Sequence, residues 1–253
     1  MSEEDNTPLM AQYQSIKATC SDEVLFFRLG DFYEMFFDDA IQISKELELT
    51  LTGKNCGLEE RAPMCGVPFH SAETYINKLI EKGYKVAICE QVEDPKLAKG
   101  LVRREVTRVV TPGTNSFTET LDETKNNYLM SIVAGSTGFG ISAVDVTTGE
   151  FHALEVVDVS KLLDEINRYM PAEIITNDSL FLSDPDINDL KNRLNIVIST
   201  LAPKYFDPKG CEKILTDHFG MTSDELGLSS LSKAKIASGT AMMYLIETQK
   251  NPL

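Results

Sequence analysis

Residues 31–36, DFYEMF, place two acidic and three aromatic side chains within six positions. Asp31 and Glu34 are three residues apart, which is the spacing of a capping box at the start of a helix. Phe32 and Phe36 stand one helical turn apart, so this periodicity predicts a helix that begins at Asp31 and buries Phe32. The alternative interpretation is that Phe32 and Glu34 contact a ligand, and the spacing alone leaves both open.

Carboxylates in the second half suggest another chemistry. Asp145 lies in ISAVDVTTGEF, a strand pattern similar to that of the leading aspartate in ribonuclease-H-like folds. A two-metal nuclease needs several converging carboxylates, and the spacing of Glu173 and Asp178 does not single them out. A surface or turn-supporting Asp145 is therefore favoured over a catalytic one. The sequence contains no GxxxxGK[ST], GxGxxG or GxSxG motif.

The cysteines and histidines predict neither disulfides nor a metal site. The five cysteines form no CxxC pair, and the three histidines are scattered along the chain. Reduced thiols in the core are the better interpretation.

The charge of the chain limits its partners. Its net charge is −15, which argues against tight nonspecific binding to nucleic acid. The first half is locally basic, however: residues 61–108 carry nine basic and six acidic side chains, whereas residues 116–253 carry 11 basic and 20 acidic ones. No apolar run is long enough to span a membrane, and the N-terminus lacks the pattern of a signal peptide. We expect a cytoplasmic protein whose first half is the part that meets phosphate.

Alternating strand and helix patterns in the first half predict an α/β domain. Its expected helices and strands are a helix at 7–19, a strand at 24–29, the helix from Asp31, a strand at 47–52, a loop at 53–70, a helix after Ser71, and strands at 84–92 and 102–110.

The second half predicts a meander followed by mixed elements. Three strands at 127–135, 138–146 and 149–157 are joined by short turns, which favours antiparallel pairing. Helices and strands alternate after them, and a last helix from about 229 to 249 stops at Asn251-Pro252-Leu253. We expect the chain to be the N-terminal part of a longer protein.

A family resemblance covers nearly the whole chain. TPLMAQY, LFFRLGDFYEMFFDDA, LTLTGK, APMCGVPFHSAETYINKL, KVAICEQVEDP and VTRVVTPGT resemble the mismatch-recognition domain of the MutS family of DNA mismatch repair proteins. GISAVDVTTGEF and GTAMMYLIETQ resemble the connector domain of that family. The resemblance implies a mixed-sheet α/β domain at 1–114, a linker at 115–127 and a ribonuclease-H-like connector at 128–253.

The resemblance also implies roles for the opening motif. In the family a Phe-x-Glu motif enters mismatched double-stranded DNA from the minor groove, and Phe32 and Glu34 match it. An inserted phenylalanine unstacks a base step, which costs least where a base is already mispaired. Phosphates repel a carboxylate, so we expect Glu34 to be protonated, or to share a proton, when it hydrogen-bonds the mispaired base.

Weaker assignments follow from the same resemblance. Met64 matches a position that lies against the minor groove, and Asp31 adjoins the wedge. Lys54 and Arg108 match positions of basic residues near DNA. Arg104 and Arg108 have the same parity on their strand, so we expect them to point to one side.

The implied partners and activity concern the family as a whole. Its connector domain helps to recruit a MutL-type partner, for which the mixed-charge helix at 208–219 is a candidate surface. Homodimerisation, ATP hydrolysis, ATP and magnesium belong to an ATPase domain outside this sequence. We therefore expect no enzymatic activity and no cofactor in these 253 residues. The alternatives are a metal-dependent nuclease that uses Asp145 and a pure interaction module that does not sense DNA.

Overall fold

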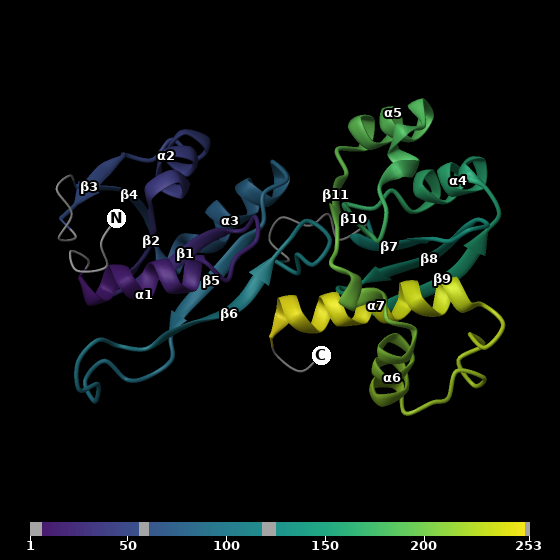
Figure 1. Ribbon diagram of the computed structural model, residues 1–253. Coiled ribbons are helices and arrows are strands. Elements are labelled where there is room, and N and C mark those ends of the chain that lie inside the picture. The colour runs from purple at the N-terminus through teal and green to yellow at the C-terminus, as the bar shows by residue number, and fades with distance from the viewer. Residues whose placement is uncertain (1–6, 56–60, 118–124, 251–253) are drawn as a thin grey trace. The chain divides into compact units, whose positions relative to one another are not determined.

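The computed structural model describes residues 7–55, 61–117 and 125–250 (Figure 1). Two compact units divide the chain between Thr111 and Pro112. This division lies three residues before the expected end of the first domain. Residues 112–117 lie in the second unit by this division.

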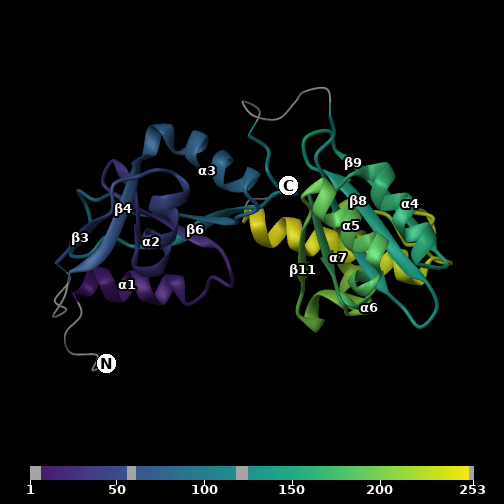
Figure 2. The same ribbon diagram turned by 90° about the horizontal axis from the view of Figure 1, so that it is seen from above.

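The first unit is built on a six-stranded mixed sheet of order β3-β4-β2-β1-β5-β6. Its strands are β1 (Val24–Leu29), β2 (Phe32–Phe36), β3 (Thr52–Lys54), β4 (Ala62–Pro68), β5 (Val86–Gln91) and β6 (Arg104–Val110). Its helices are α1 (Pro8–Lys17), α2 (Phe37–Glu46), the 3-10 turn η2 (Phe69–Ser71) and α3 (Ala72–Glu81). Helix α1 packs on one face of the sheet, and α2 and α3 cover the other (Figure 2).

The expected helix from Asp31 is wrong, because residues 32–36 form strand β2. The segment pairs on both sides, antiparallel with β1 and antiparallel with β4. This pairing outweighs the local capping preference, since tertiary context overrides helix propensity. Helix α2 starts only at Phe37, whose φ of 54° turns the chain out of the strand.

The expected loop at 53–70 is also wrong in part. Residues 62–68 form the interior strand β4, which lies between β2 and β3. The strand expected at 47–52 is displaced to Thr52–Lys54. Pro63, Gly66 and Pro68 give this segment the composition of a loop, but glycine and proline are tolerated at strand ends and beside close backbone contacts.

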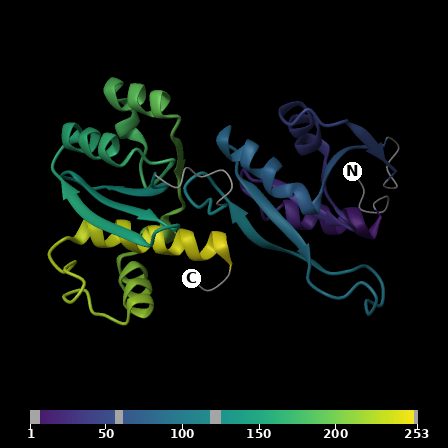
Figure 3. The ribbon, with the colours of Figure 1, turned by 180° about the vertical axis from the view of Figure 1, so that it is seen from behind.

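The second unit, drawn in teal, green and yellow in Figure 3, carries a sheet. This sheet has five strands in the order β11-β10-β7-β8-β9. Strands β7 (Tyr128–Ala134), β8 (Phe139–Asp145) and β9 (Glu150–Val156) form the predicted antiparallel meander, and β10 (Glu173–Thr176) and β11 (Val197–Thr200) add in parallel. This confirms the expected α/β class with a ribonuclease-H-like second domain.

Helices cover both faces of this sheet. Helices α4 (Val159–Tyr169) and α5 (Pro185–Leu194) pack on one face, and α7 (Ser232–Gln249) packs on the other beside α6 (Pro208–Phe219). The 3-10 turns η3 (Leu180–Ser183) and η4 (Pro203–Phe206) complete the unit. No helix in the described part of the chain is long and apolar enough to cross a membrane.

Candidate functional site

Strand β2 presents Phe32 and Glu34 on the same face of the first sheet. Successive side chains of a strand alternate between its two faces, so residues two apart point the same way. Phe32 is 45% exposed, while Tyr33 and Met35 point to the opposite face and are buried. A helix would have turned Phe32 and Glu34 apart, so the strand is what allows them to act together.

A tight turn holds Phe32 at the end of the sheet. Gly30 and Asp31 form a two-residue hairpin loop between the paired residues Leu29 and Phe32. Gly30 has a φ of 58°, a left-handed conformation that glycine adopts without steric cost. Asp31 is exposed in this turn, and its carbonyl accepts a hydrogen bond from the backbone N–H of Phe69 at 2.9 Å.

Glu34 pairs with Lys54 instead of capping a helix. The Nζ of Lys54 lies 3.5 Å from Oε2 of Glu34, whose side chain is only 17% exposed. Gly66 is the β4 residue directly opposite Glu34. A Cβ on Gly66 would lie 3.1 Å from the carbonyl oxygen of Tyr33 and 3.3 Å from Cγ of Glu34. The absence of a side chain at Gly66 therefore provides the space that the Glu34 side chain occupies.

The structure brings five of the six predicted site residues to one region. Met64 on β4 lies opposite Phe36 of β2, two positions from Gly66, and packs against the same face. Lys54 lies on the adjacent strand β3. Asp31 precedes Phe32 in the turn, so the five residues lie on three neighbouring strands and the turn that begins β2.

Arg108 lies apart from this region, on the far edge strand β6. A β-bulge interrupts β6, because Arg108 pairs with Ile88 whereas Val106 pairs with Cys89. The extra residue reverses the alternation, so Arg104 and Arg108 point to opposite faces and the expectation that they share a side is wrong. Burial lowers the pKa of both guanidinium groups below the ordinary value.

Arg104 has a structural role. Its guanidinium lies over the Phe27 ring at 5.0 Å, and Nε donates to the carbonyl of Arg28 at 2.7 Å. Its Nη1 donates to Gln12 of α1 at 2.9 Å. This buried arginine therefore joins α1 to the strand that carries the turn.

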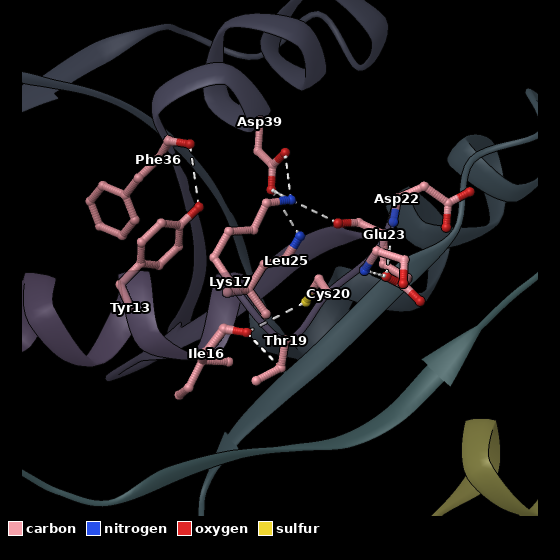
Figure 4. A network of polar contacts seen from close by, with 11 residues as sticks. Tyr13, Ile16, Lys17, Thr19, Cys20, Asp22, Glu23, Leu25, Phe36 and Asp39 are labelled. Carbon is pink, nitrogen blue, oxygen red and sulfur yellow. Dashed lines mark hydrogen bonds and ion pairs between the residues drawn. The ribbon is translucent and has the colours of Figure 1, made fainter. Parts of the chain in front are cut away.

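Helix α1 is fixed to the sheet by a polar network (Figure 4). Nζ of Lys17 lies 2.8 Å from Oδ2 of Asp39 and donates to the carbonyl of Glu23 at 2.8 Å. The same carboxylate accepts the backbone N–H of Leu25 at 3.0 Å. The hydroxyl of Tyr13 donates to the carbonyl of Phe36 at 3.3 Å. These contacts fix α1 and α2 to the sheet and hold Phe36, the last residue of the strand that begins with Phe32.

Two residues near the site were missed by the sequence analysis. Phe69, at the start of η2, is 41% exposed, and the Cζ of Arg28 lies 3.8 Å from its ring centroid. Arg28 lies in the predicted strand at 24–29, and Phe69 lies in PFH at the end of the predicted loop at 53–70. Neither position indicates that Phe69 lies beside the Gly30–Asp31 turn.

The second unit does not assemble a nuclease site from the described residues. Asp145 is buried and accepts hydrogen bonds from Thr147 and from the backbone N–H of Asn127. Glu173 pairs in register with Leu129, on the α7 face of the sheet, and accepts from Tyr244 at 2.6 Å and from the N–H of Gly113 at 3.0 Å. Asp145 lies in register with Tyr128, on the other face.

This arrangement confirms the turn-supporting interpretation of Asp145. The sheet separates its carboxylate from that of Glu173, whereas a two-metal site needs convergence. No group of three or more potential ligands that could hold a metal ion occurs among the residues that the structure describes.

The thiols in the described ranges are free and mostly buried, as predicted. Cys65, Cys89 and Cys211 are buried, and Cys20 is partly exposed. Burial raises the pKa of Cys89 to about 12 and those of Cys65 and Cys211 to about 11. Cys56 lies outside the described residues.

The fold and the site define a mixed-sheet recognition domain followed by a ribonuclease-H-like connector domain. Family models agree with this division: MutS domain I matches residues 7–119, and MutS domain II matches residues 127–253. The chain belongs to the MutS family of DNA mismatch repair proteins.

Curated relatives named DNA mismatch repair protein MutS match almost the entire chain. The protein from Lachnoclostridium phytofermentans is 58% identical over 98% of this chain, and that from Ruminiclostridium cellulolyticum is 52% identical over 96%. The protein from Acetivibrio thermocellus is 53% identical over 96%. The chain spans only 27% to 28% of the length of these relatives.

Proposed function

We propose that this chain recognises mispaired or unpaired bases in double-stranded DNA by inserting Phe32 from the minor groove. The observation that supports this most directly is that Phe32, a 45% exposed aromatic residue, shares one strand face with Glu34 at the end of a rigid sheet. A side chain that inserts between bases needs a large aromatic ring, held at the end of a strand, beside a hydrogen-bonding group.

The energetics favour mispaired sites. Unstacking a base step costs on the order of a few kcal/mol, and the cost falls where pairing is already weak. The site places few side chains able to read the sequence of a groove, so discrimination arises mainly from how easily the duplex deforms.

Glu34 gives the wedge a hydrogen-bonding partner for the displaced base. In the free protein its carboxylate faces Lys54 at 3.5 Å. When DNA binds, Lys54 turns to a phosphate and Glu34 bonds the mispaired base in a protonated or proton-sharing form. Met64 and Asp31 lie against the groove beside them, and Arg108 contacts the duplex from the other edge of the sheet.

Phe32→Ala tests the wedge. We expect the variant to fold normally and to lose its preference for a heteroduplex over the matched duplex, because the stacking ring is gone. The measurement is the fluorescence of a 2-aminopurine beside the mismatch, at about 20 mM salt, where weak binding is detectable. Leu51→Ala is the matched control, since Leu51 is 46% exposed in the same unit. We expect Leu51→Ala to keep the wild-type preference, and a heteroduplex preference that survives in Phe32→Ala contradicts the proposal.

Glu34→Gln and Glu34→Ala test the hydrogen bond. Glutamine keeps a donor and an acceptor without charge, so we expect Glu34→Gln to retain much more of the discrimination than Glu34→Ala. Loss of one hydrogen bond to a base costs about 1 to 3 kcal/mol of discrimination. The ratio of heteroduplex to homoduplex affinity in both variants is the readout. Wild-type ratios in both variants would remove Glu34 from the mechanism.

The partner and cofactor assignments belong to the longer relatives. We infer that a MutL-type partner approaches α6, where Lys213 and Asp217 form an exposed i,i+4 pair. We infer that ATP and magnesium bind outside these 253 residues, because the sequence contains no phosphate-binding loop motif. By the family resemblance, homodimerisation belongs to the same ATPase domain.

A further inference from the structure

Four side chains meet behind the turn that joins β1 and β2, on the face of β2 that points away from the candidate site. They are Arg28, Tyr33, Phe69 and Glu90, and we name this cluster the turn brace. Cζ of Arg28 lies 3.8 Å from the ring centroid of Phe69 and 5.6 Å from that of Tyr33. Nη1 of Arg28 lies 3.4 Å from Oε2 of Glu90, and the hydroxyl of Tyr33 donates to Oε1 of that carboxylate.

The turn brace fixes both peptide carbonyls of the turn. Nε of Arg28 donates to the carbonyl of Gly30 at 2.5 Å. The backbone N–H of Phe69 donates to the carbonyl of Asp31 at 2.9 Å. Phe32 follows immediately, so the direction of its side chain depends on a turn that is held by Arg28 of β1 and by Phe69 of η2.

Arginine is the residue this geometry requires. A guanidinium is planar, so one side can stack on a ring while its edge donates to a carbonyl and a carboxylate. A lysine would supply a point charge without the flat surface. Tyr33 completes the arrangement, because its ring packs against Phe26 in the core while its hydroxyl reaches Glu90.

We propose that the turn brace is a positioning device that sets the direction of Phe32, and that Phe69 determines specificity through it without contacting the mispaired base. The proposal rests on the proposed function of Phe32. Phe69 is 41% exposed, so it contributes little to the core, and its contact with Arg28 is the feature that gives the ring a role. Because the turn is already held in one geometry, less conformational entropy is lost when Phe32 binds than would be lost by a mobile turn.

The test compares Phe69→Leu, which removes the flat ring, with Phe69→Tyr, which keeps it. Tyr75→Leu is the matched control, because Tyr75 also makes a cation–π contact, with Lys78 at 5.7 Å within α3, but does not touch the turn. Each variant is measured for its melting temperature, for amide exchange of residue 69, and for heteroduplex preference by 2-aminopurine fluorescence at about 20 mM salt.

We expect Phe69→Leu to lower the heteroduplex preference roughly two- to fivefold, to speed exchange of the residue 69 amide, and to leave homoduplex affinity and melting temperature near wild type. Phe69→Tyr and Tyr75→Leu should match the wild type. Tyr33→Phe, which removes only the bond to Glu90, should give an intermediate loss.

Two results overturn the proposal, and they are distinguishable. If Phe69→Leu keeps the wild-type preference while Phe32→Ala loses it, the turn brace has no role in recognition and the proposed function stands. If Phe32→Ala also keeps the preference, the proposed function and the positioning role fall together. A Phe69→Tyr variant that behaves like Phe69→Leu likewise contradicts the role of the stacked ring.

Discussion

At the scale of single residues, Glu90 links stability to pH. Its carboxylate faces Arg28 and Tyr33 and lies opposite Glu105 on β6. Burial raises its pKa above the ordinary value of 4.5, although Arg28 acts in the opposite direction. The bond from Tyr33 also favours the ionised form, so the direction of the shift shows that desolvation outweighs both partners.

The sign of the pH dependence follows from this direction. A carboxyl group whose pKa is higher in the folded state is protonated more readily there, so it stabilises the fold at low pH. This stabilisation is complete when the pH is below 4.5, the pKa of the carboxyl group in the unfolded chain. It is lost as the pH rises through the pKa of Glu90 in the folded state. We expect the unfolding free energy of the wild type, relative to Glu90→Gln, to fall over this interval in denaturant titrations. A difference that rises with pH would contradict the assignment.

At the scale of helices and strands, Asp39 joins three elements. It lies in the first turn of α2, accepts the N–H of Leu25 on β1 and pairs with Lys17 on α1. Asp39→Ala leaves the Leu25 amide without its acceptor, and we expect the unfolding free energy to fall by about 2 to 3 kcal/mol. Chemical denaturation of the variant and the wild type measures this change in unfolding free energy.

The neighbouring Asp38 provides the control for this prediction. It is exposed in the same helical turn, so Asp38→Ala loses only a favourable interaction with the helix dipole, about 0.5 kcal/mol. Equal losses in the two variants would show that the network of Asp39 contributes nothing beyond its charge.

Strand β2 shows what the sequence can and cannot predict. The meander at β7, β8 and β9 was predictable because each strand alternates and each turn is short. The segment 32–36 was not, because Asp31 and Glu34 satisfy a local helix rule while the pairing partner, β4, lies about thirty residues away in a stretch rich in glycine and proline. Local patterns do not contain such nonlocal pairing.

The candidate site was predictable in composition but not in geometry. Phe32, Glu34, Met64 and Lys54 were assigned by resemblance, and the structure gathers them on one face. The β-bulge that separates Arg104 from Arg108 has no signal in VRREVTRVV. Parity along a strand holds only while the pairing is regular.

At the scale of the whole molecule, we expect charge to set the affinity for DNA. The chain carries 24 basic and 39 acidic residues, and a net charge of this sign repels phosphate at long range. Near the candidate site, Arg28 is paired with Glu90, and Arg104 is buried against α1. We therefore expect insertion of Phe32, if it occurs as proposed, to gain little from counterion release, which supplies most nonspecific affinity.

We expect this chain alone to bind a heteroduplex weakly, with a dissociation constant above about 1 μM in about 150 mM salt, and with a shallow salt dependence. Each phosphate contact contributes about 0.9 to the slope of log K against log salt, so Lys54→Gln should reduce the slope by about 1 if Lys54 meets a phosphate. Fluorescence anisotropy at about 20, 50 and 150 mM salt measures both quantities. Nanomolar binding at the highest salt would show that contacts beyond the candidate site hold the duplex. An unchanged slope in Lys54→Gln would mean that Lys54 serves only to hold Glu34.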